Sequence, residues 1–335
     1  MKAQASNNAG APRTVVITGA SAGVGRATAL EFAAPGVRLA LLARGAAGLE
    51  GACAEVRARG AEALALQVDV ADAQQVDEAA ARIEAELGAI DVWINCAMLT
   101  VYSPVQQMRA EEYRRVTEVT YLGAVHGTCA ALRHMRPRNR GVIVQVGSAL
   151  SYRAIPLQSA YCAAKFALRG FTDDLLVELL ADKSAIHLTM LQLSAFNTPQ
   201  FDWARSRMPM RSQPVPPIFQ PELAAKAIRW ASEHRRRELC VGFPAFKVIY
   251  GNMLAPWFAD RLLAREGISG QQSSEPQLAD PPDNLFEAVD RDMGSHGRFD
   301  AQARSGSLQF WLTTHRGLLA GLVLVLIVAL LAVLD

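Results

Sequence analysis

The sequence predicts an α/β fold built on a doubly wound parallel sheet of about seven strands. Short runs rich in β-branched residues and leucine alternate with helix-length stretches, and the runs are apolar on both faces, as strands covered by helices on both sides are. The strand-like runs are residues 14–18, 37–42, 63–68, 91–94, 141–146, 186–193 and 238–241. Helix-length stretches between them include residues 23–34, 72–87 and 160–180. This β-α-β alternation is typical of a parallel sheet.

The composition fits a globular protein and excludes several classes of function. Hydrophobic residues make up 51% of the 335 positions and charged residues 20%, enough apolar surface for a sizeable core. The net charge of +2, with scattered basic residues, argues against a nucleic-acid partner. The 5 cysteines never form a CxxC pair and the 6 histidines share no metal-ligand spacing, so we expect neither a disulfide framework nor a metal site. Residues 1–12 are polar, lack the apolar core of a signal peptide, and are predicted to be flexible.

A glycine-rich turn joins the first predicted strand to the first helical stretch. Glycines permit a tight turn and let main-chain N–H groups approach a pyrophosphate at a helix N-terminus. A purely structural turn is the alternative, but the position between strand and helix at the start of a β-α-β unit is the one such a motif needs. We therefore expect a dinucleotide to contact Thr18, Gly19, Ser21, Gly23, Val24 and Gly25.

The second predicted strand is followed by Ala43 and Arg44. Enzymes that prefer NAD usually place a carboxylate near this point to hold the ribose 2′-hydroxyl. Ala43 supplies none, whereas the guanidinium of Arg44 can pair with a 2′-phosphate. The pattern favours NADP(H) over NAD(H); the alternative is an arginine that only faces solvent.

Tyr161 and Lys165 lie four positions apart in a helical stretch, so both polar tips can point into one cleft. Hydride transfer to a carbonyl needs an acid that protonates the oxygen, and the reverse reaction needs a base. A nearby ammonium favours the phenolate, so we expect Lys165 to lower the pKa of Tyr161. Ser148, after the fifth predicted strand, can hydrogen-bond the substrate oxygen. These three residues form the predicted catalytic group.

The TGxxxGxG turn, Ser148 and the YxxxK pair together resemble the short-chain dehydrogenase/reductase family, over roughly residues 13–242. The resemblance implies a Rossmann-type catalytic domain, assigned to residues 13–266, that moves a hydride between a nicotinamide and a carbonyl or alcohol. It also implies that Lys165 holds the nicotinamide ribose beside Tyr161. Further cofactor contacts implied by the resemblance are Asp69, Val70, Asn95 and Thr198.

Three positions depart from the family pattern. Thr120 stands where the family keeps a catalytic asparagine, Ser194-Ala195 replaces a Pro-Gly pair, and Met98 replaces a glycine. Thr120 is predicted to take over part of the proton relay. The alternative, from another class of function, is a cofactor-binding sensor or scaffold with little turnover. NADPH consumption across a panel of carbonyl compounds would separate the two.

A segment rich in proline, methionine and aromatic residues, 199–221, is predicted to be a loop or helical flap over the sheet. In the family this region covers the substrate. Its bulky side chains fit either a pocket for an apolar small-molecule substrate or ordinary packing. They are Phe201, Trp203, Met208, Met210 and Phe219.

The C-terminal part of the sequence predicts a membrane anchor on a stalk. Residues 267–307 are polar and rich in proline and glycine, so we expect a flexible linker. Residues 308–335 are the predicted anchor, because residues 317–334 carry no charge and would span roughly 27 Å as a helix, about the thickness of a bilayer core. Phe310, Trp311 and Arg316 flank this run as interfacial residues do. We expect the catalytic domain to face the cytoplasm; a buried helix is the alternative, and a homodimer stays open.

Overall fold

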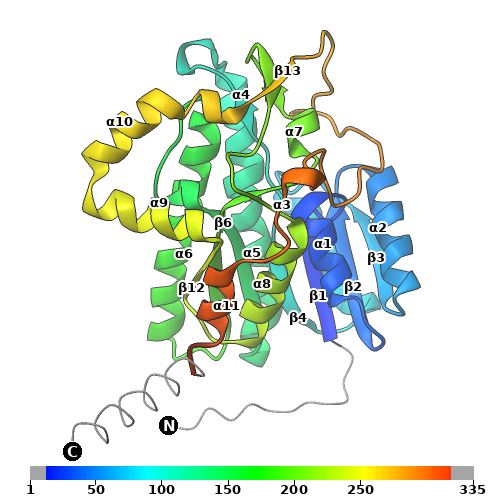
Figure 1. Cartoon of the computed structure of the whole chain (residues 1–335). Coiled ribbons are helices and arrows are strands. Elements are labelled where there is room, and N and C mark those ends of the chain that lie inside the picture. Colours follow the sequence, from blue (N-terminus) through cyan, green and yellow to red (C-terminus); the bar gives the residue numbers. More distant parts are fainter. Residues whose placement is uncertain (1–12, 318–335) are drawn as a thin grey trace, which may run out of the picture.

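The computed structural model describes residues 13–317 and contains a seven-stranded parallel sheet (Figure 1). Neighbouring strands, from one edge to the other, are β12 (Glu238–Val241), β7 (His187–Leu193), β6 (Val142–Ser148), β4 (Ile90–Asn95), β1 (Arg13–Thr18), β2 (Val37–Ala43) and β3 (Glu62–Gln67). The chain starts in the middle of the sheet, builds outward to β3, and then crosses back over β1 to build the other half. The prediction of a doubly wound parallel sheet is confirmed.

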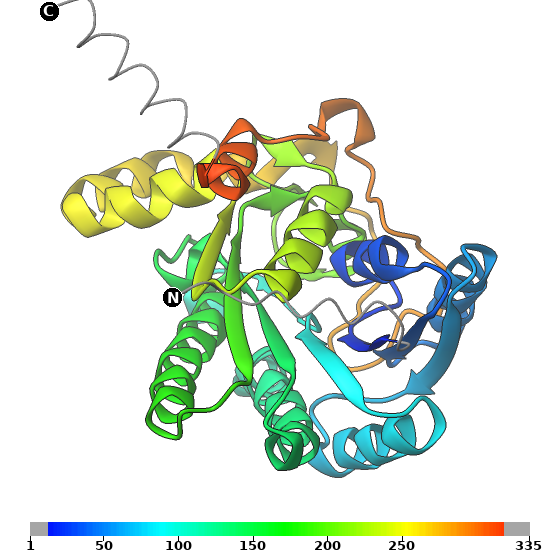
Figure 2. The same cartoon turned by 90° about the horizontal axis from the view of Figure 1, so that it is seen from below.

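Helices cover both faces of this sheet (Figure 2). One face carries α1 (Gly23–Phe32), α2 (Ala46–Ala58) and α8 (Pro221–Glu233). The other carries α3 (Ala73–Glu86), α4 (Ala110–Thr117), α5 (Gly123–Met135) and α6 (Ser159–Ala181). Burial on both sides explains why the strands read as continuous apolar runs.

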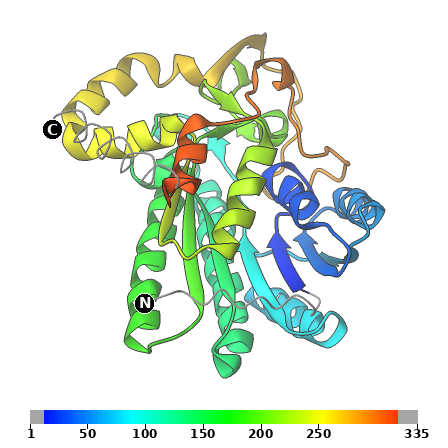
Figure 3. The same cartoon turned by 60° about the horizontal axis from the view of Figure 1, so that its bottom comes forward.

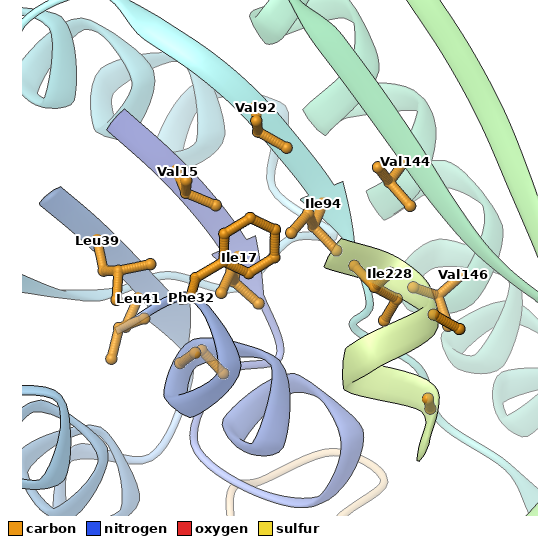
Figure 4. Close-up of a cluster of buried hydrophobic side chains, with 14 of the residues drawn as sticks. Val15, Ile17, Phe32, Leu39, Leu41, Val92, Ile94, Val144, Val146 and Ile228 are labelled. Carbon is orange, nitrogen blue, oxygen red and sulfur yellow. The ribbon is translucent and has the colours of Figure 1, made fainter. Parts of the chain in front are cut away.

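Successive residues of one strand supply the two hydrophobic cores. Val15 and Ile17 of β1 pack with Phe32 of α1 and Ile228 of α8, as Figure 4 shows. Val16, between them, points to the opposite face and joins the core under α3, α5 and α6. All three β1 side chains are fully buried, so the middle of the sheet is fixed from both sides.

The crossing between the two halves of the sheet positions the site. The chain leaves β1 toward one side and β4 toward the other, so the connections diverge at their carboxyl ends. In open α/β sheets ligands bind in the crevice formed at this point. Short elements close over it: α7 (Gln200–Trp203), β5 (Val101–Tyr102), β8 (Ala195–Phe196), β9 (Arg205–Ser206), β10 (Met210–Ser212) and β11 (Ile218–Phe219).

After the last sheet strand the chain forms a helical arm. Helix α9 (Phe243–Leu254) and helix α10 (Pro256–Glu266) project from the body of the domain (Figures 1 and 3). Helix α10 buries none of its residues, and α9 buries Ala245 and Ile249 alone. Helix α11 (Leu308–Thr314) lies against α9 and β12.

The prediction of a flexible linker over residues 267–307 is wrong. Strand β13 (Gln272–Pro276) pairs with β10, and residues 283–299, which we call the strap, run past α2 and α1 (Figure 3). Leu285 and Phe299 are buried, and Arg26 of α1 forms an ion pair with Asp292. The polar composition hid these partners, because isolated apolar side chains and single acids give no periodic signal in a sequence.

The predicted membrane span of residues 317–334 lies outside the described residues except for Gly317. Within residues 13–317, no helix is both long and apolar enough to cross a bilayer.

Candidate active site

A cavity of about 1170 Å³ opens at the carboxyl ends of the sheet strands. The glycine-rich turn and the ends of β2, β3, β4, β6 and β7 form one part of its wall. Residues of α6, α7, α9, α10 and α11, the loop before α6 and parts of the strap form further wall. Drug-sized ligands occupy pockets of roughly 300–1,000 Å³. The cavity therefore has room for a ligand larger than a single small molecule.

The glycine-rich turn brings the main chain to the cavity wall. Gly23 adopts φ +57°, and a Cβ on Gly25 would lie 2.2 Å from the carbonyl oxygen of Gly19, so both positions require glycine. Helix α1 begins here without any side-chain cap, which leaves N–H groups of its first turn for an anion. One of them, the Gly23 N–H, donates to the carbonyl of Gly294 in the strap at 3.1 Å. The turn is therefore suited to bind a pyrophosphate. The neighbouring bond between Gly23 and the strap was not predictable from the sequence.

Ser148, Tyr161 and Lys165 all line the same cavity. Ser148 ends β6, and the other two lie on the first turns of α6. The Nζ of Lys165 is 5.6 Å from the ring centroid of Tyr161 and donates to the carbonyl of Val146 at 2.6 Å. The side chains of Tyr161 and Ser148 are hydrogen-bonded to each other. The structure thus brings together the three residues that the sequence grouped.

Burial sets the protonation of this group. It raises the pKa of Tyr161 well above its usual range, and the hydrogen bond with Ser148 offsets only part of that increase. Burial also lowers the pKa of Lys165 to about 8. The expectation that the ammonium lowers the pKa of Tyr161 is therefore wrong for this state of the site. At neutral pH the phenol is protonated and able to act as an acid.

Arg44 lies at the cavity wall after β2, but its guanidinium is already bonded to the strap. It donates to the carbonyl of Asn284 at 2.5 Å, to that of Phe286 at 3.1 Å and to that of Leu285 at 3.5 Å. Burial lowers the pKa of Arg44, and the nearby positive charge of Arg115 lowers it further. The guanidinium of Arg44 is therefore held by the strap and does not only face solvent, which was the alternative to a contact with the 2′-phosphate.

Several other predicted contacts also line the cavity. Asp69 and Val70 follow β3, and Thr198 lies next to Gly23. The carboxylate of Asp69 accepts a hydrogen bond from Arg115. Ser21, Val24 and the three glycines of the turn complete the predicted residues found there.

Thr18 and Asn95 do not line the cavity: Thr18 holds the loop after β4, which does, and Asn95 joins β4 to β6 and α5. The Thr18 hydroxyl accepts from the N–H groups of Cys96 and Ala97, at 3.0 and 3.2 Å. The Asn95 amide donates to Gln145 at 3.0 Å and accepts from the indole of Trp93 at 2.9 Å. Their predicted contacts with the cofactor stay predictions, and the bonds inside the fold give both residues a positioning role.

Thr120 lies outside the cavity lining as well. It is fully buried in a π-helical turn, Glu118–Leu122. Its hydroxyl accepts from the N–H of Leu99 at 2.9 Å and donates to the carbonyl of the same residue at 3.1 Å. With both bonds made to main chain, this hydroxyl anchors the loop after β4, and the structure does not support the predicted place in a proton relay.

The bulky side chains of the predicted flap, residues 199–221, partly line the cavity and partly pack inside the domain. Phe201, Trp203 and Phe219 line the cavity, whereas Met208 packs beneath it against Tyr102 and Phe201. Sequence reasoning missed the strap residues at the wall, Ala288, Val289 and Arg291, and the apolar residues of α9 and α10. The aromatic residues of 243–258 were the available signal for the helical arm.

Comparison with known proteins identifies the family. The profile described as "short chain dehydrogenase" matches residues 13–208, more than half of the chain. The chain belongs to this family. The match ends before the helical arm and the strap, which are therefore not part of what the family profile describes.

Relatives of the short-chain dehydrogenase family agree in sequence and in fold. An uncharacterized oxidoreductase of Bacillus subtilis, YxnA, is 29% identical over 82% of this chain and 78% of its own length. A short-chain dehydrogenase from Streptomyces avermitilis has a solved structure that is 28% identical, with a TM-score of 0.63, over 77% of this chain and 97% of that one. An alcohol dehydrogenase from Thermococcus sibiricus, solved with 5-hydroxy-NADP, is 26% identical, with a TM-score of 0.59, over 68% of this chain and 95% of that one. The protein is thus an oxidoreductase of this family that binds a nicotinamide cofactor.

Proposed function

We propose that the protein is an NADP(H)-dependent reductase of an apolar carbonyl compound, or a dehydrogenase of the matching alcohol. The observation that carries the proposal is the meeting of Ser148, Tyr161 and Lys165 in one cavity with the glycine-rich turn. The walls near these three residues are apolar and aromatic, and include Leu150 and Ile155. An apolar substrate loses little by leaving water for such a wall.

The chemistry of the site divides between cofactor and protein. The bound nicotinamide supplies or accepts the hydride. Tyr161, whose raised pKa keeps its proton at neutral pH, donates that proton to the carbonyl oxygen. The Ser148 hydroxyl donates a hydrogen bond to the same oxygen, where negative charge develops. The ammonium of Lys165 holds positive charge next to Tyr161 and helps to restore its proton after turnover.

The preference for NADP(H) rests on charge at the adenosine end of the cavity. Besides burial, the positive charge of Arg115 lowers the pKa of the nearby Arg44, and the carboxylate of Asp69, which pairs with Arg115, offsets part of that repulsion. A 2′-phosphate would relieve this repulsion, whereas a 2′-hydroxyl would not. The alcohol dehydrogenase of Thermococcus sibiricus, a similar structure, was solved with 5-hydroxy-NADP. These observations support NADP(H); Arg44 would meet the phosphate while the strap carbonyls hold its other N–H groups.

Assays of NADPH oxidation with a panel of apolar aldehydes and ketones test the function. Tyr161→Phe should lower kcat by about a hundredfold or more, because general acid catalysis contributes roughly 10²–10⁴-fold, and should leave the Kd for NADPH nearly unchanged. Tyr102→Phe is the matched control, since Tyr102 is a buried tyrosine on the same cavity wall. Its kcat should stay near that of the wild type. NADPH binding without turnover of any compound would favour the sensor or scaffold instead.

A further inference from the structure

The helical arm carries a large apolar surface that the fold leaves uncovered. We use the name apolar face for the exposed hydrophobic residues of α9, α10 and α11. Leu254 is 86% exposed, Trp257 61% and Met253 58%. The remaining members are Phe243, Phe246, Val248, Tyr250, Phe258, Leu262, Leu308, Trp311 and Leu312. Folded proteins seldom leave so many large apolar side chains together in water unless the patch binds something.

The apolar face is also the rim of the active-site cavity. Six of its members line that cavity while remaining exposed: Phe243, Val248, Phe258, Leu262, Leu308 and Leu312. A side chain that is exposed and also lines the cavity marks its mouth. The cavity therefore opens between the helical arm and α11, through a ring of apolar side chains.

The sequence beyond α11 indicates what covers this face. Helix α11, which carries Leu308, Trp311 and Leu312, ends at Thr314, and the uncharged run of residues 317–334 follows almost at once. Trp257, Tyr250 and Trp311 are the residue types that favour the boundary between lipid and water. Basic side chains lie among them, with Arg261 over the ring of Trp257 at 5.2 Å. Aromatic rings with basic neighbours beside an apolar run are the pattern of a surface that rests on a bilayer.

We propose that the apolar face docks on a lipid bilayer, so that apolar substrate passes from the membrane into the cavity between the helical arm and α11. The docking does not depend on the proposed catalytic function, whereas the access route rests on it. A second copy of the chain, or residues 318–334 folded onto the face, are the other occupants that the test separates from lipid.

Tryptophan fluorescence of the full chain in vesicles tests the docking. The probe is phosphatidylcholine with brominated acyl chains, compared with the same lipid without bromine. Trp257→Phe should remove about half of the bromine quenching seen in the wild type, because Trp257 and Trp311 are the exposed tryptophans on the apolar face. Trp230→Phe is the matched control, since Trp230 lies in α8 and stacks on His234; it should keep the full quenching. Equal quenching in both variants would overturn the docking and point to one of the other occupants.

Turnover by the same vesicle-bound enzyme tests the access route. Leu254→Glu should raise KM about tenfold for a long-chain aldehyde dissolved in the vesicles, the order expected when one large side chain leaves an apolar phase. Its kcat, and its KM for a short water-soluble aldehyde, should not change, because Leu254 does not line the cavity. Leu180→Glu, on the exposed surface of α6, is the control and should leave both KM values alone.

The two measurements fail in different ways. If Trp257 is quenched but Leu254→Glu raises neither KM, the access route is wrong and the docking stands. If Trp257 is quenched but neither aldehyde is turned over, the proposed function is wrong and the docking stands again. If Trp257 is not quenched, no result of the assay rescues the bilayer as the occupant.

Discussion

The buried charge of Lys165 is expected to govern how the reaction depends on pH. The Lys165 side chain is almost fully buried, burial lowers its pKa to about 8, and its Nζ donates a hydrogen bond to the carbonyl of Val146. The charged form therefore predominates at neutral pH and is lost as the pH rises through about 8. Tyr161 shows no such change in the neutral range, because burial moves its pKa upward. We expect Lys165, and not Tyr161, to set the alkaline limit of reduction.

The pH profile of kcat/KM checks this, because it reports the free enzyme. For carbonyl reduction, kcat/KM should be level near neutral pH and fall about tenfold per unit above the pKa of Lys165. An arginine at position 165 keeps its charge at every accessible pH. Lys165→Arg should therefore lower kcat/KM but abolish its fall above about pH 8. A wild-type profile that stays level to about pH 9.5 would contradict the assignment.

Individual site residues differ in how well the sequence predicts their role. Ser148, Tyr161 and Lys165 were predictable, because their types and spacing carry the chemistry. The partners of Thr18 and Asn95 were not predictable, because the direction of a side chain at a strand end depends on the neighbouring strands and not on its own sequence. Both found main-chain or amide partners inside the fold.

At the scale of elements, the strap replaces a predicted linker. Its contacts with the cofactor half of the domain include the carbonyls on Arg44, the Gly294 carbonyl on the N–H of Gly23, the Asp290 carboxylate on the N–H of Ala47 at 2.9 Å, and the ion pair of Asp292 with Arg26. The side chain of Arg26 is 2% exposed and also bonds Glu55. Its guanidinium is therefore already held in place when it pairs with Asp292. Such contacts join residues far apart in the chain, and no local pattern predicts them.

Loosening the strap should speed the release of cofactor. Asp292→Asn removes the charge that Arg26 holds, and the hydrogen bond from Arg26 is the main reason why the pKa of Asp292 is lowered. Because Asp292 is partly exposed, we expect a modest effect, about a fivefold faster release of NADPH. Stopped-flow fluorescence of bound NADPH measures it, and trypsin should cut faster after Arg291.

Asp77→Asn is the control for this variant. Asp77 also pairs with an arginine, Arg133, but on the exposed surface of α3 and away from the cavity. Its NADPH release rate should equal that of the wild type. If both variants behave alike, the strap does not retain the cofactor.

At the scale of the whole molecule, the sheet was the most predictable part. Every predicted sheet strand lies within a residue or two of the observed one, because burial on both faces leaves a plain apolar signal. The helical arm and the strap were not predictable in this way. Their positions depend on contacts with a domain that has already folded, and these contacts leave no local pattern in the sequence.

The C-terminal run makes a prediction for the intact protein. With residues 317–334 uncharged, the full chain should pellet with membranes and resist carbonate extraction. Val325→Arg should release most of it, since an arginine in the middle of a span costs about 2.5–3.5 kcal/mol. Val325→Leu is the matched control and should stay in the pellet. Extraction of the wild type by carbonate would mean that the run does not span a bilayer.

The strap also dictates when the cofactor site can be completed during synthesis. Arg44 and its partner Asn284 are 240 positions apart, and Arg26 and Asp292 are 266 apart. At roughly 5–20 residues per second, a ribosome needs about 12–50 s to make the stretch between them. For that time Arg26 and Arg44, in the β1–β3 half of the nascent chain, lack their partners in the strap. The dinucleotide end of the enzyme, although it is encoded first, is therefore completed only after the strap has been made.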